Sequence, residues 1–191
     1  MIKTTALTLL LICLIFFTTN MGSANDSGKI VIMPINAIGD ISNENIAVIE
    51  EIIYDHFREN RLVELISNEQ MESLTGETTG SRLQIIKTVT AKTKSGKALI
   101  FSLLRYNERV GDRYSVKDPA SLAFEFKLIN SDDGKVTCSG SYDETQQSLT
   151  ENIFNFPRAF KRGFKWLTVK EIANEAVREK LDECPALVSD S

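Results

Sequence analysis

The segment KIVIMPINAIGD, Lys29–Asp40, decides the fold that this sequence predicts. Its short apolar run, Ile30–Ile35, is typical of a buried strand, and a glycine-containing loop follows Pro34. We expect the first strand of an α/β domain here, with its outgoing loop, residues 36–42, at the carboxyl edge of the sheet, where ligand crevices open. Because that loop lacks a glycine-rich phosphate-binding pattern, we interpret it as an interaction edge.

Helical and strand patterns alternate along the rest of the chain. Ser42 can cap the first helix, and capping boxes are predicted at Ser67 with Gln70 and at Thr168 with Glu171. In order, the expected elements are a helix from Ser42 to Asn60, a strand at Leu62–Ile66, two short helices between Ser67 and Gly96, strands at Ala98–Val110, Leu122–Leu128 and Val136–Tyr142, and a last helix from Thr168 to Pro185. The sequence therefore predicts a single α/β domain, residues 25–191, with a mixed β-sheet flanked by helices.

Residues 1–24 have the form of a secretory signal peptide. Lys3 is their only charge, the apolar block Leu7–Phe17 follows it, and the small residues Gly22, Ser23 and Ala24 suit a cleavage site. The apolar block is short for a membrane-spanning helix. We therefore expect cleavage near Ala24 and a periplasmic or secreted protein.

Cys13 offers an alternative to plain cleavage. A bacterial lipoprotein carries its acylated cysteine at the end of the apolar block, after a small residue, whereas Cys13 lies inside the block and follows Ile12. Lipid anchoring through Cys13, with association with the outer membrane, stays open as the second prediction.

Composition limits the partners. The chain has 191 residues, a formal net charge of −4 and a pI of about 5.2, which argues against nucleic acid because phosphate binding needs a basic face. His56 is the only histidine, and no metal-ligand or phosphate-loop spacing is present, so we predict no metal and no cofactor.

The mature chain keeps two cysteines, Cys138 and Cys184. In an oxidising compartment they could pair as a disulfide. Alternatively, Cys138 is a buried strand residue that is unrelated to Cys184 near the tail. The sequence leaves both possibilities open.

The stretch FNFPRAFKRGFKW, Phe154–Trp166, is the most unusual of the chain because it interleaves aromatic and basic residues in an acidic protein. One interpretation is a contact surface for an anionic partner such as membrane headgroups, glycan or an acidic protein face. The other is that the aromatic residues dock this irregular segment onto the sheet while the basic residues stay in water. The candidate surface residues are Arg158, Lys161, Arg162, Lys165, Phe160, Phe164 and Trp166.

No familiar catalytic set is present: the sequence has no nucleophile elbow and no cysteine–histidine motif. An enzyme would have to use carboxylates that the fold brings together, as a hydrolase does. Candidates near strand ends are Glu108, Asp112, Asp143 and Glu144. We predict that the chain is not an enzyme and keep the carboxylate-dependent hydrolase as an alternative.

Several phrases resemble known bacterial proteins. KIVIMPI followed by a helix, and LVELIS followed by a capped helix, resemble the amino-terminal domain of TolB and the CsgG-like envelope proteins over Lys29–Arg109. RYNERVG, DPASLAFEFKLIN, YDETQQSLTENIF and KRGFKWLTVKEIA resemble a group of small bacterial envelope lipoproteins. The resemblance implies a Gram-negative periplasm and carries over no catalytic residue. The chain departs from that group at its lipid-attachment cysteine, and at Cys138, where a tryptophan is common.

The sequence thus predicts a non-enzymatic exported envelope protein, a binding or assembly component. Its expected partner is an envelope protein or a membrane surface.

Overall fold

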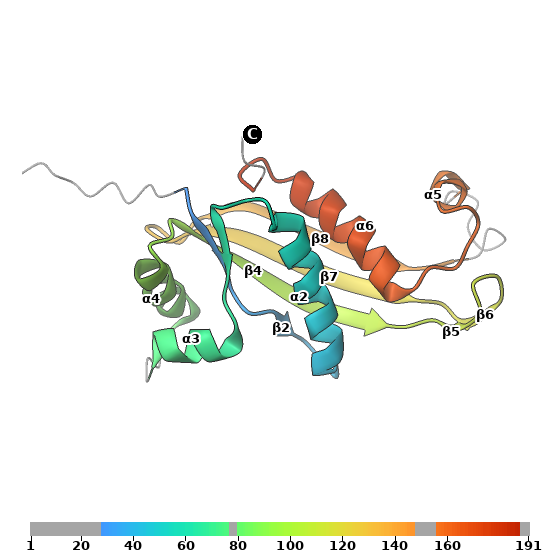
Figure 1. Ribbon diagram of the computed structural model, residues 1–191, viewed down its shortest axis with the longest axis horizontal. Helices are drawn as coiled ribbons and strands as arrows, with labels where there is room; N and C mark the ends of the chain where they lie inside the picture. Colours follow the sequence, from blue (N-terminus) through green and yellow to red (C-terminus); the bar gives the residue numbers. More distant parts are fainter. Residues whose placement is uncertain (1–27, 77–79, 148–155, 188–191) are drawn as a thin grey trace, which may run out of the picture.

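The computed structural model describes residues 28–76, 80–147 and 156–187. Six strands of the described residues form one mixed sheet, in which β3-β1-β4-β7-β8 lie in order and β2 pairs with β4 beside this path (Figure 1). β1 is parallel to β3 and β4, whereas β4, β7 and β8 are antiparallel to one another. The strands are β1 (Ile30–Ile32), β2 (Asn36–Ala37), β3 (Val63–Leu65), β4 (Lys97–Asn107), β7 (Ser121–Asn130) and β8 (Val136–Thr145).

Helices cover both faces of the sheet, and β1 alternates between the two layers. Ile30 and Ile32 contact the larger core under α2 (Asn43–Phe57) and α6 (Val169–Asp182). Val31 and Met33 contact a smaller core under α3 (Asn68–Thr75) and α4 (Arg82–Thr93). This arrangement confirms the prediction of one α/β domain with a mixed sheet flanked by helices.

The predicted helix starts are confirmed. Ser42 caps α2 by accepting a hydrogen bond from the Asn45 amide. Ser67 and Gln70 form the capping box of α3, and Thr168 and Glu171 form that of α6. A capping box involves residues only three positions apart, so the sequence alone is enough to predict these helix starts.

The loop after the opening strand is more structured than predicted. Pro34 has no amide hydrogen and interrupts the strand, but Asn36–Ala37 then pairs with Ser102 and Leu103 of β4 as β2. The loop proper is therefore shorter than residues 36–42, because the first two of these residues belong to the sheet.

Two further elements were not expected from the sequence. The strand predicted over Ala98–Val110 ends at Asn107, and Val110–Gly111 (β5) instead forms a small hairpin with Val116–Asp118 (β6). The aromatic-basic stretch contains the short helix α5 (Phe156–Lys161). The hairpin and α5 lie at the same end of the long axis of the molecule (Figure 1).

Candidate functional site

The candidate surface predicted at Phe154–Trp166 falls on α5 and on the turn that leads into α6. Phe154 lies outside the described residues. Gly163 and Phe164 both adopt positive φ angles, 65° and 55°, and turn the chain back toward the sheet. Leu167 is then fixed because its amide donates to the buried side chain of Gln146 at 2.9 Å. The segment is thus a short helix and a tight turn, tied down at its carboxyl end.

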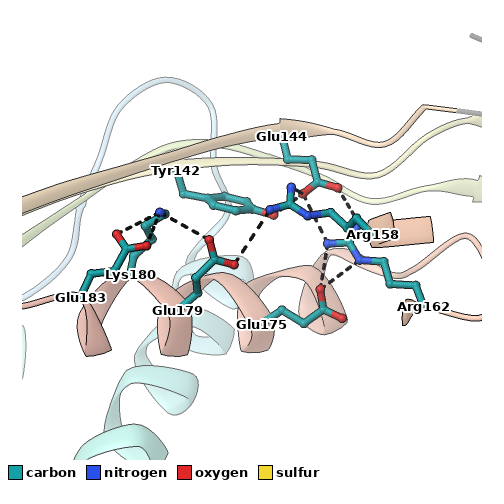
Figure 2. Close-up of polar contacts among 8 residues, drawn as sticks. All are labelled: Tyr142, Glu144, Arg158, Arg162, Glu175, Glu179, Lys180 and Glu183. Carbon is teal, nitrogen blue, oxygen red and sulfur yellow. Dashed lines mark hydrogen bonds and ion pairs between the residues drawn. The ribbon is translucent and has the colours of Figure 1, made fainter. Parts of the chain in front are cut away.

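The two arginines of this segment bind acids of the chain itself. Arg162 Nη1 lies 2.6 Å from Glu144 Oε1 on β8, and Arg162 Nη2 lies 2.8 Å from Glu175 Oε2 on α6. Arg158 Nη1 lies 2.9 Å from Glu144 Oε2 (Figure 2). The Arg162 side chain is only 6% exposed, so it joins the end of α5 to the body of the domain and presents little surface to solvent.

The carboxylate of Glu144 is the centre of this network. It also accepts a hydrogen bond from the hydroxyl of Tyr142, whose ring stacks on Phe124 of the core at 5.6 Å. Because side chains two residues apart on a strand share a face, Tyr142 and Glu144 both lie on the face that α6 covers. On the neighbouring strand β7, Phe124 is paired with Tyr142 and Leu122 with Glu144. The network therefore connects the aromatic core directly to α5.

The electrostatics of the network hold Glu144 in its ionised form. Burial alone would raise the pKa of Glu144, but the hydrogen bonds from Arg162 and Tyr142 outweigh it and leave that pKa below its ordinary value. Burial, reinforced by the hydrogen bond to Glu144, raises the pKa of Tyr142. An ionised carboxylate held by two guanidinium groups serves as a structural anchor and is unsuited to general acid catalysis at neutral pH.

The network continues along the surface of α6. Arg158 Nη2 lies 3.9 Å from Glu179, and Lys180 lies 3.4 Å from Glu179 and 2.8 Å from Glu183 (Figure 2). These outer pairs are largely exposed, so they contribute much less to stability than the pairs of Glu144.

Apart from Trp166, the remaining residues of the predicted surface are exposed. The side chains of Phe160 and Phe164 are 66% and 48% exposed, and their rings meet edge to face at 6.0 Å. Lys161 and Lys165 are exposed, and neither forms an ion pair within the described ranges. Trp166 is half-buried.

The β5–β6 hairpin extends this exposed surface. The Trp166 amide donates to the carbonyl of Arg113 at 2.9 Å, and Arg109 Nη1 donates to the Trp166 carbonyl at 2.6 Å. Tyr114, at the hairpin tip, is 74% exposed and Val110 is 53% exposed. We call the outward-facing residues Tyr114, Phe160, Lys161, Phe164 and Lys165 the aromatic-basic end.

Sequence reasoning missed the hairpin part of this end. Its signal was weak, because residues 105–118 are mostly polar or charged and only Gly111 marks a turn. The contact between the hairpin and Trp166 joins segments far apart in the chain, which no local pattern reveals.

Cys138 and Cys184 are joined by a disulfide in the structure, with their Cα atoms 6.0 Å apart. The bond ties the edge strand β8 to the segment that follows α6, and Cys184 is fully buried in the larger core. The pairing closes a loop between residues 46 positions apart.

Each of the four carboxylates considered for a hydrolase has a different hydrogen-bond or ion-pair partner within the chain. Glu108 accepts a hydrogen bond from the Val169 amide at the start of α6, and Asp143 forms an ion pair with Arg105. Asp112 accepts from the next amide along the chain, and Glu144 lies in the arginine network. None of the four lines the clefts of about 500, 250 and 230 Å³ found in the described part of the chain.

The same part of the chain holds no group of three or more histidine, cysteine, aspartate or glutamate residues that could hold a metal ion. His56 lies 3.6 Å from Asp182, and burial lowers the pKa of its imidazole. Among the described helices, none has the length and apolarity needed to cross a bilayer.

No family model matches the sequence, and no curated protein matches it. Solved structures do match. The chain resembles the PelC dodecamer from Paraburkholderia phytofirmans with a TM-score of 0.54, 12% identity, and coverage of 86% of this chain and 90% of that one. A second PelC dodecamer structure from the same organism gives 0.52, with 12% identity and coverage of 84% and 89%.

The lipoprotein GNA1162 from Neisseria meningitidis matches with a TM-score of 0.44, 14% identity, and coverage of 71% of this chain and 97% of that one. At identities this low, the likeness to the two PelC structures is one of fold alone. The resemblance to TolB and the CsgG-like proteins stays a prediction.

Proposed function

We propose that this chain is a non-enzymatic exported protein of the bacterial envelope that binds another envelope component through its aromatic-basic end. One observation carries the proposal. Tyr114 and Phe160 are among the most exposed large apolar side chains of the described residues, and they belong to the β5–β6 hairpin and to α5, which lie at one end of the molecule (Figure 1). Exposed aromatic residues gathered in one place are characteristic of interaction sites.

Phe164 adds to this support through its backbone. A phenylalanine at φ 55° lies in the left-handed region, where glycine or asparagine costs less. Strained positions of this kind cluster at functional sites because a requirement other than stability keeps the side chain there. A contact role for the ring supplies such a requirement.

Two features support export of the protein: the signal-peptide pattern of residues 1–24 and the pairing of Cys138 with Cys184. A signal peptide cleaved near Ala24 delivers the domain to an oxidising compartment, where a disulfide between Cys138 and Cys184 persists. Mass spectrometry of the processed amino terminus decides between the two routes: Asn25 as first residue supports cleavage without lipid, whereas an acylated Cys13 supports the lipoprotein alternative.

The absence of enzymatic activity is part of the proposal. Each of Glu108, Asp143 and Glu144 binds a different partner within the chain, so none is left poised as a general acid or base. A hydrolytic activity that is lost on replacing any of these carboxylates, with the fold preserved, would restore the hydrolase alternative.

The binding role is tested by photocrosslinking in the envelope. A photoreactive phenylalanine analogue at position 114 or 160 is expected to give crosslinked protein or lipid adducts in cells. The matched control is position 54, because Tyr54 is 54% exposed and belongs to α2, which crosses the middle of the molecule (Figure 1). Adducts at none of the positions, or equal adducts at all three, would contradict the proposal.

A further inference from the structure

We infer that the partner of the aromatic-basic end is the surface of a lipid bilayer that carries anionic phospholipid headgroups. The inference rests on the proposed function and names the partner of the same site.

The first reason is the shape of this end. The elements that carry it, α5 with the turn after it and the β5–β6 hairpin, lie at one end of the long axis (Figure 1), and its five side chains are exposed. None of the clefts described above is lined by residues of this end. A small ligand or a glycan needs a concave site, whereas a bilayer surface accepts side chains that project outward.

The second reason is the kind of side chain that projects. Tyr114 is of the residue type that is enriched at the level of the headgroups, and Phe160 and Phe164 offer apolar rings of the kind that peripheral proteins bury at the headgroup–acyl boundary. The rings of Phe160 and Phe164 contact each other, so both can enter the same shallow layer.

The third reason is charge. Glu144, Glu175 and Glu179 already neutralise the two arginines of this segment. Lys161 and Lys165 form no ion pair with a described residue, so their positive charge is available to a partner. On the hairpin, Arg113 lies 3.6 Å from Glu171, and the charge of Lys117 is balanced in number by the neighbouring acids Asp112 and Asp118. The positive charge that this end presents therefore comes from the two lysines, which lie beside the aromatic rings as a membrane surface requires.

Trp166 provides a built-in reporter. It is the only tryptophan of the chain, it is half-buried at the base of this end, and its backbone is bonded to the hairpin. Tryptophan fluorescence, excited selectively over that of the four tyrosines, therefore reports on the surroundings of Trp166 at this end.

The test is co-sedimentation of the protein, purified from the periplasm of an expression host, with lipid vesicles. All variants carry Cys13→Ser, so that a lipid anchor contributes nothing. Vesicles of phosphatidylethanolamine with phosphatidylglycerol are compared with vesicles of phosphatidylcholine alone. We expect binding to the anionic vesicles, weakened by salt, together with quenching of Trp166 by lipids brominated near the headgroup.

Two variants divide the contribution of charge from that of the rings. Lys161→Glu with Lys165→Glu is expected to weaken binding to anionic vesicles about tenfold or more. Each lysine near an anionic surface makes a substantial favourable contribution to the free energy of binding. Tyr114→Ser with Phe160→Ser is expected to weaken it by about the same factor, by removing inserted apolar area. The matched control, Tyr54→Ser with Lys87→Glu, changes exposed residues of α2 and α4 and is expected to bind as the parent does.

Circular dichroism and thermal unfolding establish that each variant is folded. Absence of binding to anionic vesicles, or equal loss in the control variant, overturns the inference. If photocrosslinking at positions 114 and 160 still captures an envelope protein, only the choice of a membrane is overturned and the proposed function stands. If neither experiment detects a partner, both fail.

Discussion

Two pairs of basic residues in the same short segment have opposite surroundings. Arg158 and Arg162 point toward the body of the domain and bind Glu144, whereas Lys161 and Lys165 point outward. Arg158 and Arg162 are one helical turn apart, because the Arg162 amide donates to the Arg158 carbonyl, whereas Lys165 follows the left-handed turn at Gly163 and Phe164. The planar guanidinium suits buried, bidentate pairing with a carboxylate, and the strongly hydrated ammonium suits a wet surface. The aromatic-basic stretch is therefore both an anchor and a contact surface.

Removing the disulfide is expected to change the free energy of unfolding most, because the bond links β8 to the segment after α6, and Arg162 is anchored to β8 and α6. Cys138→Ala with Cys184→Ala opens a loop between residues 46 positions apart and is expected to lower the free energy of unfolding by about 4 kcal/mol. Urea unfolding followed by circular dichroism measures it. A reductant should destabilise the parent by a similar amount and leave the variant unchanged; a parent insensitive to reductant would contradict this prediction.

Removing an inward arginine is expected to cost nearly as much. Arg162→Ala leaves the half-buried Glu144 without its main partner and should lower the free energy of unfolding by about 3 kcal/mol. The matched change Lys161→Ala removes an exposed side chain and should stay within about 0.5 kcal/mol of the parent. Equal losses in the two variants would erase the distinction between the two pairs.

Glu144, which the two inward arginines bind, should also make the free energy of unfolding depend on pH. The pKa of Glu144 is lowered in the folded protein, so its ionised form stabilises the fold above the ordinary carboxyl range, and that contribution is lost as pH falls through the folded-state value. Unfolding measured from neutral pH downward should show the gap between the parent and Glu144→Gln closing in acid. A gap that stays constant would mean that the Glu144 charge contributes nothing.

The sequence was informative where signals are local. Capping boxes, strand alternation and the buried run Ile30–Ile35 led to the correct fold class. Period-two alternation on β8 could also have revealed that Glu144 faces inward beside Tyr142 and needs a cation. What it could not reveal is which cation, because Arg162 lies 18 residues away and its other partner, Glu175, lies 13 residues beyond.

The remaining differences have the same origin. β2 is two residues long and exists because β4 offers it an edge, and the β5–β6 hairpin gains its position from Trp166. Both are decided by tertiary contacts, which override weak local preferences.

The smallest expected effect concerns the outward face itself. Phe164→Asn relieves a left-handed backbone position at a half-exposed site and is expected to raise the free energy of unfolding by up to about 1 kcal/mol. The same variant should bind the envelope less well than the parent. A loss of stability would show that the ring serves the fold more than the contact.

The most direct test of the account is the fraction of protein that co-sediments with isolated envelope membranes for Lys161→Glu with Lys165→Glu, compared with the parent. We predict clear loss of binding with an unchanged unfolding midpoint, because both lysines are exposed and neither forms an ion pair with a described residue. Undiminished binding in this folded variant would contradict it.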